Sequence, residues 1–119
     1  MGTLIRHLSY KVQSISAELI FFQSFEKTEV FHEFRNKNND LYGLMFKLTN
    51  GLDIELFTSS NAHNYDDVHF AFGVKEIEKV WSSLRSKYTS SDIFQGRTDQ
   101  IKQFHVLSPG GFRFEFHEL

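Results

Sequence analysis

Near its carboxyl end the chain reads Gly110-Gly111-Phe112-Arg113-Phe114-Glu115-Phe116, which matches Asn50-Gly51-Leu52-Asp53-Ile54-Glu55-Leu56 sixty residues earlier. A second match, at an offset of 62, joins His7-Leu8-Ser9-Tyr10-Lys11-Val12 to His69-Phe70-Ala71-Phe72-Gly73-Val74. Each member of the second pair is directly followed by a helical pattern. Two matches in the same order indicate an internal repeat, and such a repeat largely determines the architecture.

Each half of the chain is predicted to have the element order βαβββ, from alternating apolar residues in strands and helical spacing between them. Asn50-Gly51 is a strong hairpin signal, and Ser14 can cap the first helix, which runs to about Phe25. The second helix is expected over residues 75–88. The predicted strands span residues 4–12, 28–35, 41–49, 52–58, 68–74, 92–96, 101–107 and 112–119.

This element order predicts an α+β fold, in which two βαβββ repeats form curved mixed sheets. We expect a single domain over residues 1–119, with the first repeat at about 1–60 and the second at about 66–119. The polar, aperiodic stretch 59–67 is the expected link between them. A chain of 119 residues is too short for two independent cores.

Composition excludes several classes of protein. Thirteen basic and fifteen acidic residues are mixed along the chain and give a net charge of -2, so no nucleic-acid partner is expected. The apolar runs are too short for a membrane span, and no secretory signal is expected. The chain has no cysteine, which excludes disulfides, thiolate nucleophiles and Cys-based metal sites. It is compatible with a reducing compartment, and we expect a cytoplasmic protein.

Side-chain alternation gives the four matched strands two different faces. One face is apolar and suited to packing under helices. The other carries ionisable groups on every strand, and such a face needs water or a ligand. The polar and ionisable residues of that face are His7, Ser9, Lys11, Asp53, Glu55, His69, Arg113, Glu115 and His117.

Four of these residues form a pattern, because a His and a Glu recur at equivalent positions of both repeats. They are His7 and Glu55 in the first repeat, and His69 and Glu115 in the second. Two imidazoles and two carboxylates suit a divalent metal such as Ni²⁺, Co²⁺ or Zn²⁺, with Mn²⁺ or Fe²⁺ also possible. A metal there would polarise an oxygen, and a carboxylate beside it could move protons.

These motifs resemble the vicinal oxygen chelate superfamily, which includes glyoxalase I, fosfomycin-resistance proteins, methylmalonyl-CoA epimerase, extradiol dioxygenases and bleomycin-binding proteins. The resemblance covers essentially the whole chain and rests on residues 6–9, 53–57, 68–72 and 108–116. It implies a glyoxalase-like fold, and it places the family's four metal positions on His7, Glu55, His69 and Glu115.

Among these subfamilies the ligand pattern is most similar to glyoxalase I, since fosfomycin thiol transferases have no acid at the Glu55 position. Those transferases also carry a potassium-binding loop where this chain has residues 95–100. The resemblance therefore implies a metal-dependent lyase that isomerises a 2-oxoaldehyde–thiol adduct, with Glu115 or Glu55 shuttling the proton. No counterpart of the glutathione-binding residues of glyoxalase I is found.

Two alternatives stay open. One is a metal-free protein that binds a small aromatic or cationic molecule, as bleomycin-binding proteins do. The other is a thiol transferase acting on an anionic epoxide such as fosfomycin, with Ser9 where those enzymes place a catalytic threonine. Lys11 and Arg113 are candidates for holding an anionic substrate group, because guanidinium forks match carboxylates and phosphonates.

The resemblance also implies a partner, because glyoxalase-like chains of this length commonly complete their sites across a homodimer. His7 and Glu55 of one chain would then face His69 and Glu115 of the other. The remaining histidines have no partner pattern and are interpreted as ordinary surface or supporting residues: His32, His63 and His105.

Overall fold

Two glycines in left-handed backbone turn the chain into the last strand of each half. Gly51 has φ +89° and Gly111 has φ +87°, a region that side chains with a Cβ rarely adopt. Both stand at the same position of the predicted repeat. The computed structural model describes residues 2–61 and 69–119, and the chain divides into two compact units, Met1–Ala62 and His63–Leu119.

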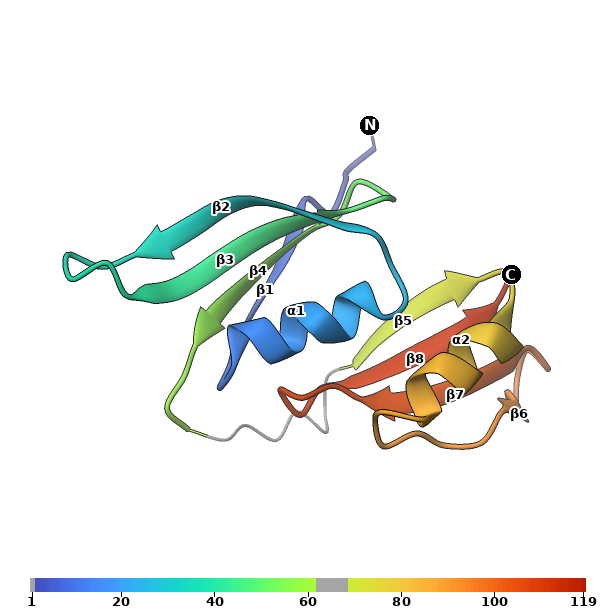
Figure 1. Ribbon diagram of the computed structural model, residues 1–119. Helices are drawn as coiled ribbons and strands as arrows, with labels where there is room; N and C mark the ends of the chain where they lie inside the picture. The colour runs from blue at the N-terminus through green and yellow to red at the C-terminus, as the bar shows by residue number, and fades with distance from the viewer. Residues whose placement is uncertain (1, 62–68) are drawn as a thin grey trace. The chain divides into compact units, whose positions relative to one another are not determined.

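Among the described residues, the first unit contains one helix and a sheet of four strands, which can be followed in Figure 1. Its sheet order is β1-β4-β3-β2, with β1 and β4 parallel and the other pairs antiparallel. The elements are β1 (His7–Val12), α1 (Ile15–Gln23), β2 (Thr28–Arg35), β3 (Leu41–Leu48) and β4 (Asp53–Thr58).

The second unit has the same topology, which confirms the repeat and the α+β class. Its sheet order is β5-β8-β7-β6, and β5 pairs in parallel with β8. The elements are β5 (His69–Val74), α2 (Ile77–Arg85), β6 (Phe94–Gln95), β7 (Lys102–Leu107) and β8 (Arg113–Glu118). The predicted link and the start of its following strand at Val68 fall largely on residues 62–68, outside the described residues.

In the first unit, α1 packs on the apolar face of the sheet. The Ser14 hydroxyl accepts a hydrogen bond from the backbone N–H of Ala17 at 3.2 Å, as the predicted cap requires. Phe22 of the helix contacts Phe46 of β3, with ring centroids 5.1 Å apart. This packing leaves the face that carries His7 and Glu55 away from the helix.

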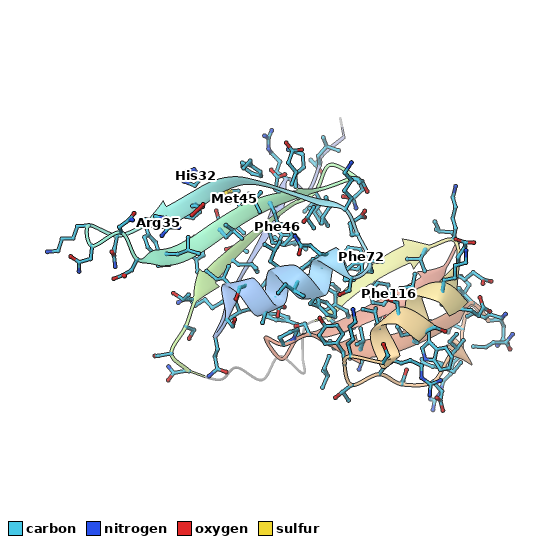
Figure 2. The ribbon with its side chains drawn as sticks, in the orientation of Figure 1. His32, Arg35, Met45, Phe46, Phe72 and Phe116 are labelled. Carbon is cyan, nitrogen blue, oxygen red and sulfur yellow. The ribbon has the colours of Figure 1, made fainter. Side chains whose placement is uncertain are left out.

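In the second unit, α2 lies over β7 and β8 (Figure 1). Its Ile77 and Leu84 side chains are fully buried. Beneath it, Phe116 is stacked with Phe72 (Figure 2), and their ring centroids are 5.9 Å apart. Phe116 is also stacked with Phe104, at a centroid distance of 5.0 Å. The apolar side of this sheet therefore faces the helix as predicted. Its other side carries Glu115.

The predicted boundaries need small corrections. β1 begins at His7 and not at Leu4, whose side chain is exposed. The second helix is shorter than predicted and ends at Arg85, where Ser86 closes it. Neither helix within the described residues is long and apolar enough to cross a membrane.

Candidate functional site

The candidate site in the second unit is produced by strand register. Glu115, in the middle of β8, is paired with Ala71 of β5 on one side and with His105 of β7 on the other. His69 of β5 is paired with Arg113. Residues paired in this way share a face of the sheet, and the small side chain of Ala71 leaves space beside the carboxylate.

The Glu115 carboxylate is the centre of the cluster. Arg113 donates a hydrogen bond from Nη2 to Glu115 Oε1 at 2.6 Å. The Nε2 atoms of His69 and His105 lie 3.4 and 3.3 Å from the same oxygen, and His117 Nε2 lies 3.2 Å from Oε2. One carboxylate is therefore surrounded by three imidazoles and a guanidinium.

These neighbours keep the carboxylate ionised although it is buried. Desolvation raises the Glu115 pKa, but hydrogen bonds from Arg113 and His117 and the charges of His69 and His105 outweigh it. The net pKa of Glu115 is lowered from its ordinary value. An ionised carboxylate is the form that binds a cation or accepts a proton.

His105 belongs to this cluster, although the sequence pattern gave it no role. Burial lowers its pKa, and the nearby charge of Arg113 lowers it further. The signal that could have identified it is its position opposite Glu115 on a neighbouring antiparallel strand. His117 was placed on the correct face by alternation but was not chosen as a site residue.

A cavity of about 500 Å³ opens beside the carboxylate. Its lining includes Arg97, Gln103, His105, Arg113, Glu115 and His117. The wall thus combines cationic and hydrogen-bonding groups with two carboxylates, those of Glu115 and Asp99. Such a lining suits a small polar molecule with an anionic part.

In the first unit, the predicted residues lie on two neighbouring strands. Cross-strand pairing joins His7 to Asp53 and Ser9 to Glu55 between β1 and β4. Asp53 is engaged by Lys47 at 3.1 Å, whereas Glu55 is half-buried. His7, Ser9 and Lys11 are exposed.

The structure therefore brings His69 and Glu115 into contact in one unit, and it places His7 and Glu55 on adjacent strands of the other. The joint site of all four residues stays a prediction. His32 is exposed on β2, with its ring 4.5 Å from that of Phe34. His63 lies outside the described residues.

The donor chemistry around Glu115 fits a divalent cation, since imidazole nitrogens and a carboxylate oxygen converge there. In the described ranges, however, no three such side chains are arranged to hold a metal as they stand. The Arg113 guanidinium lies against the oxygen that His69 and His105 also approach. A metal bound to that oxygen would compete with Arg113 for it.

Comparisons with known proteins found relatives both in sequence and in structure. No family model matches the chain. A curated relative, the metallothiol transferase FosB of Staphylococcus saprophyticus, is 26% identical over 117 residues, which cover 95% of this chain and 75% of that protein.

Solved structures share the fold. The fosfomycin-resistance protein FosX of Listeria monocytogenes superposes with a TM-score of 0.82 over 100% of this chain and 95% of that one, at 14% identity. FosX was also crystallised with Mn(II) and sulfate, and a single-residue mutant of FosX with Mn(II) and 1S,2S-dihydroxypropylphosphonic acid. A glyoxalase family protein of Enterococcus faecalis has a TM-score of 0.78 and 23% identity over 97% of both chains.

The repeat, the matched motifs and the relatives agree with one another. Together with the βαβββ topology of both units, they confirm the resemblance seen in the sequence. The shared fold and the curated relative therefore support the resemblance of this chain to the vicinal oxygen chelate superfamily.

Proposed function

We propose that this chain is a metal-dependent thiol transferase that acts on a small electrophile carrying an anionic group, with an anionic epoxide such as fosfomycin as the substrate class. The observation that carries the proposal is the buried, ionised Glu115, with His69 and His105 beside one of its oxygens. The metallothiol transferase relative supports it. This is the alternative weighed from the sequence, and it has more support than the glyoxalase interpretation.

In this proposal His69 and Glu115 hold a divalent metal together with His7, and the metal supplies Lewis-acid polarisation of the substrate oxygen. Glu115 is ready for this role because its neighbours keep it ionised. Lys11 and Arg113 are proposed to hold the anionic group, and Ser9 to offer a hydroxyl on the same face as His7.

The transfer is balanced without an oxidant or reductant. The sulfur of a low-molecular-weight thiol forms a bond to an epoxide carbon while the carbon–oxygen bond breaks. The released oxygen takes up one proton, and the thiol gives up one. The chain's part is to orient the two reactants and to stabilise the negative charge that develops on oxygen.

Glyoxalase-type isomerisation is the second candidate, and Glu55 is the observation that favours it. Glu55 lies on the same sheet face as His7 and is half-buried. With Glu115 it would supply the second carboxylate needed to move a proton between adjacent carbons. The metal-free binding protein is the outcome expected if no divalent metal binds.

The thiol transfer proposal is tested by incubating the purified chain with fosfomycin, with L-cysteine or glutathione, and with Mn²⁺, Ni²⁺, Co²⁺ or Zn²⁺ in turn. Mass spectrometry should detect the thiol adduct. Glu115→Gln should lower turnover by more than about 100-fold, the scale of losing a positioned catalytic group. The control Glu29→Gln, an exposed carboxylate on β2, should leave turnover within about twofold. A diol product, or no product, would overturn thiol transfer.

Glu55→Gln separates the two candidates. If thiol transfer is correct, this variant should keep adduct formation within about tenfold of the wild type, because Glu55 is then only a neighbour of the site. If the chain is a glyoxalase, the same variant should lose hemithioacetal isomerisation by more than about 100-fold. Folding of the variant is checked by circular dichroism.

A further inference from the structure

Arg113 makes a contact with Glu115 that the sequence analysis did not predict. Its Nη2 lies 2.6 Å from Glu115 Oε1, closer than either His69 or His105. A guanidinium here neutralises the carboxylate in the same place that a metal would. A metal ion bound to that oxygen would lie close to the guanidinium, and the repulsion between the two positive charges would weaken the contact of Arg113 with Glu115.

Two features show that Arg113 can leave this position. Its side chain is 42% exposed, so the guanidinium has a path to solvent and to the cavity beside it. In the described part of the chain its Nε–H is buried and has no hydrogen-bond partner. A buried donor without a partner is unfavourable, so departure from Glu115 removes a cost as well as a contact.

We propose that Arg113 is the metal-responsive residue of this site. While the metal is absent, Arg113 pairs with Glu115. Metal binding displaces it, and the released guanidinium then binds the anionic group of the substrate in the adjoining cavity. This inference rests on the proposed function, and it adds an order of events, in which the metal binds before the anion.

The coupling follows from the geometry. Without metal, the guanidinium is engaged by a carboxylate of the protein itself and is not available to an external anion. With metal, the same guanidinium is released beside the cavity that also contains His105 and His117. Metal and anion therefore raise each other's affinity, as linkage between two sites requires.

The first test measures metal affinity by calorimetric titration of the full chain with Co²⁺ and Zn²⁺. Arg113→Ala should bind metal at least about tenfold more tightly than the wild type, because the competing cation is gone. Arg97→Ala is the matched control, since it removes the same charge from the same cavity. It should change metal affinity by less than about threefold at physiological ionic strength. Unchanged or weaker metal binding by Arg113→Ala, or an equal gain in Arg97→Ala, would overturn the proposal.

The second test measures binding of methylphosphonate by calorimetry, without metal and with Zn²⁺. Zn²⁺ should raise phosphonate affinity in the wild type, and this gain should be at least about fivefold smaller in Arg113→Ala. The metal's own contact with the anion is present in both proteins and cancels in the comparison. An equal gain in both proteins would contradict the role of Arg113. Arg113→Gln, which keeps a polar side chain of similar length, repeats both measurements if the alanine variant folds poorly.

Neither measurement depends on turnover, so failure of this inference is distinct from failure of the proposed function. A wild-type chain that forms the thiol adduct while Arg113→Ala shows no gain in metal affinity keeps the function and overturns the inference. If Arg113→Ala binds metal more tightly but the wild-type chain forms no thiol adduct, the competition between Arg113 and the metal is supported and the proposed thiol transfer is overturned.

Discussion

At the residue scale, Glu115 shows two opposing effects on one group. Burial alone would favour the neutral acid, whereas Arg113 and three imidazoles favour the carboxylate. The second effect prevails, so Glu115 carries a negative charge at a partly desolvated position. A charge of this kind is costly unless it is paired, and Arg113 supplies that pairing at 2.6 Å.

His105 yields a prediction about pH. Its pKa is lowered from the ordinary 6.5, first by burial and then by the charge of Arg113. A base with a lowered pKa in the folded state contributes stability above its unfolded pKa and loses it as the pH falls through the folded pKa. The melting temperature of the metal-free wild type should therefore fall between pH 7 and pH 5, and His105→Gln should fall less.

The measurement is thermal unfolding in EDTA at half-unit intervals from pH 5 to pH 8. A difference of about 4 °C between the two proteins would correspond to roughly 1 kcal/mol in a domain of this size. Parallel curves for the wild type and His105→Gln would show that His105 does not couple protonation to folding.

Individual site residues differed in how well the sequence predicted them. His69 and Glu115 were found because local alternation decides which face a strand residue occupies. His105 was missed because its role depends on which residue of β8 lies opposite it, and cross-strand register is not visible within one segment. The contact of Arg113 with Glu115 was missed for a related reason. The two are neighbours on one strand face, but the sequence does not show whether a guanidinium turns toward solvent or toward the carboxylate.

At the element scale, the strands were predicted well because both repeats carry the same alternation and the same glycine turns. The ends were predicted less well, since exposed residues such as Leu4 fit the alternation without being paired. Within β3, the glycine at position 43 has a packing role that alternation cannot show. It is paired with Phe34 of β2 and with Phe57 of β4, whose rings lie 5.2 Å apart.

Gly43→Ala should therefore destabilise the first unit. A Cβ at this position would lie 2.7 Å from Phe57 Cδ1 and 2.8 Å from Phe34 Cδ2, so both rings must move. Overpacking of this kind costs about 1–3 kcal/mol. Urea unfolding measures the change, and Gly2→Ala, whose added Cβ meets nothing within 4 Å, is the control. A loss below about 0.5 kcal/mol would mean that the rings adapt freely.

At the scale of the whole molecule, the repeat places one matched His–Glu pair at equivalent positions of each unit. Each unit has a helix-covered face and an opposite face with ionisable groups. A complete set of four donors requires one pair from each unit, because His7 and Glu55 belong to the first and His69 and Glu115 to the second. The sequence predicts this division, but it does not decide whether the two pairs come from one chain or from two.

We predict a homodimer of about 28 kDa, twice the 14.0 kDa chain, in which each site takes one pair from each subunit. The test uses two inactive chains, His7→Ala with Glu55→Ala, and His69→Ala with Glu115→Ala. In a shared arrangement the mixed dimer contains one intact site and one site lacking all four donors. The isolated mixed dimer should therefore recover about half of the wild-type metal binding, although each variant alone recovers none. Sedimentation of the wild type gives the mass independently. A monomer that binds metal, or a mixed dimer without any recovery, would show that the two pairs come together within one chain.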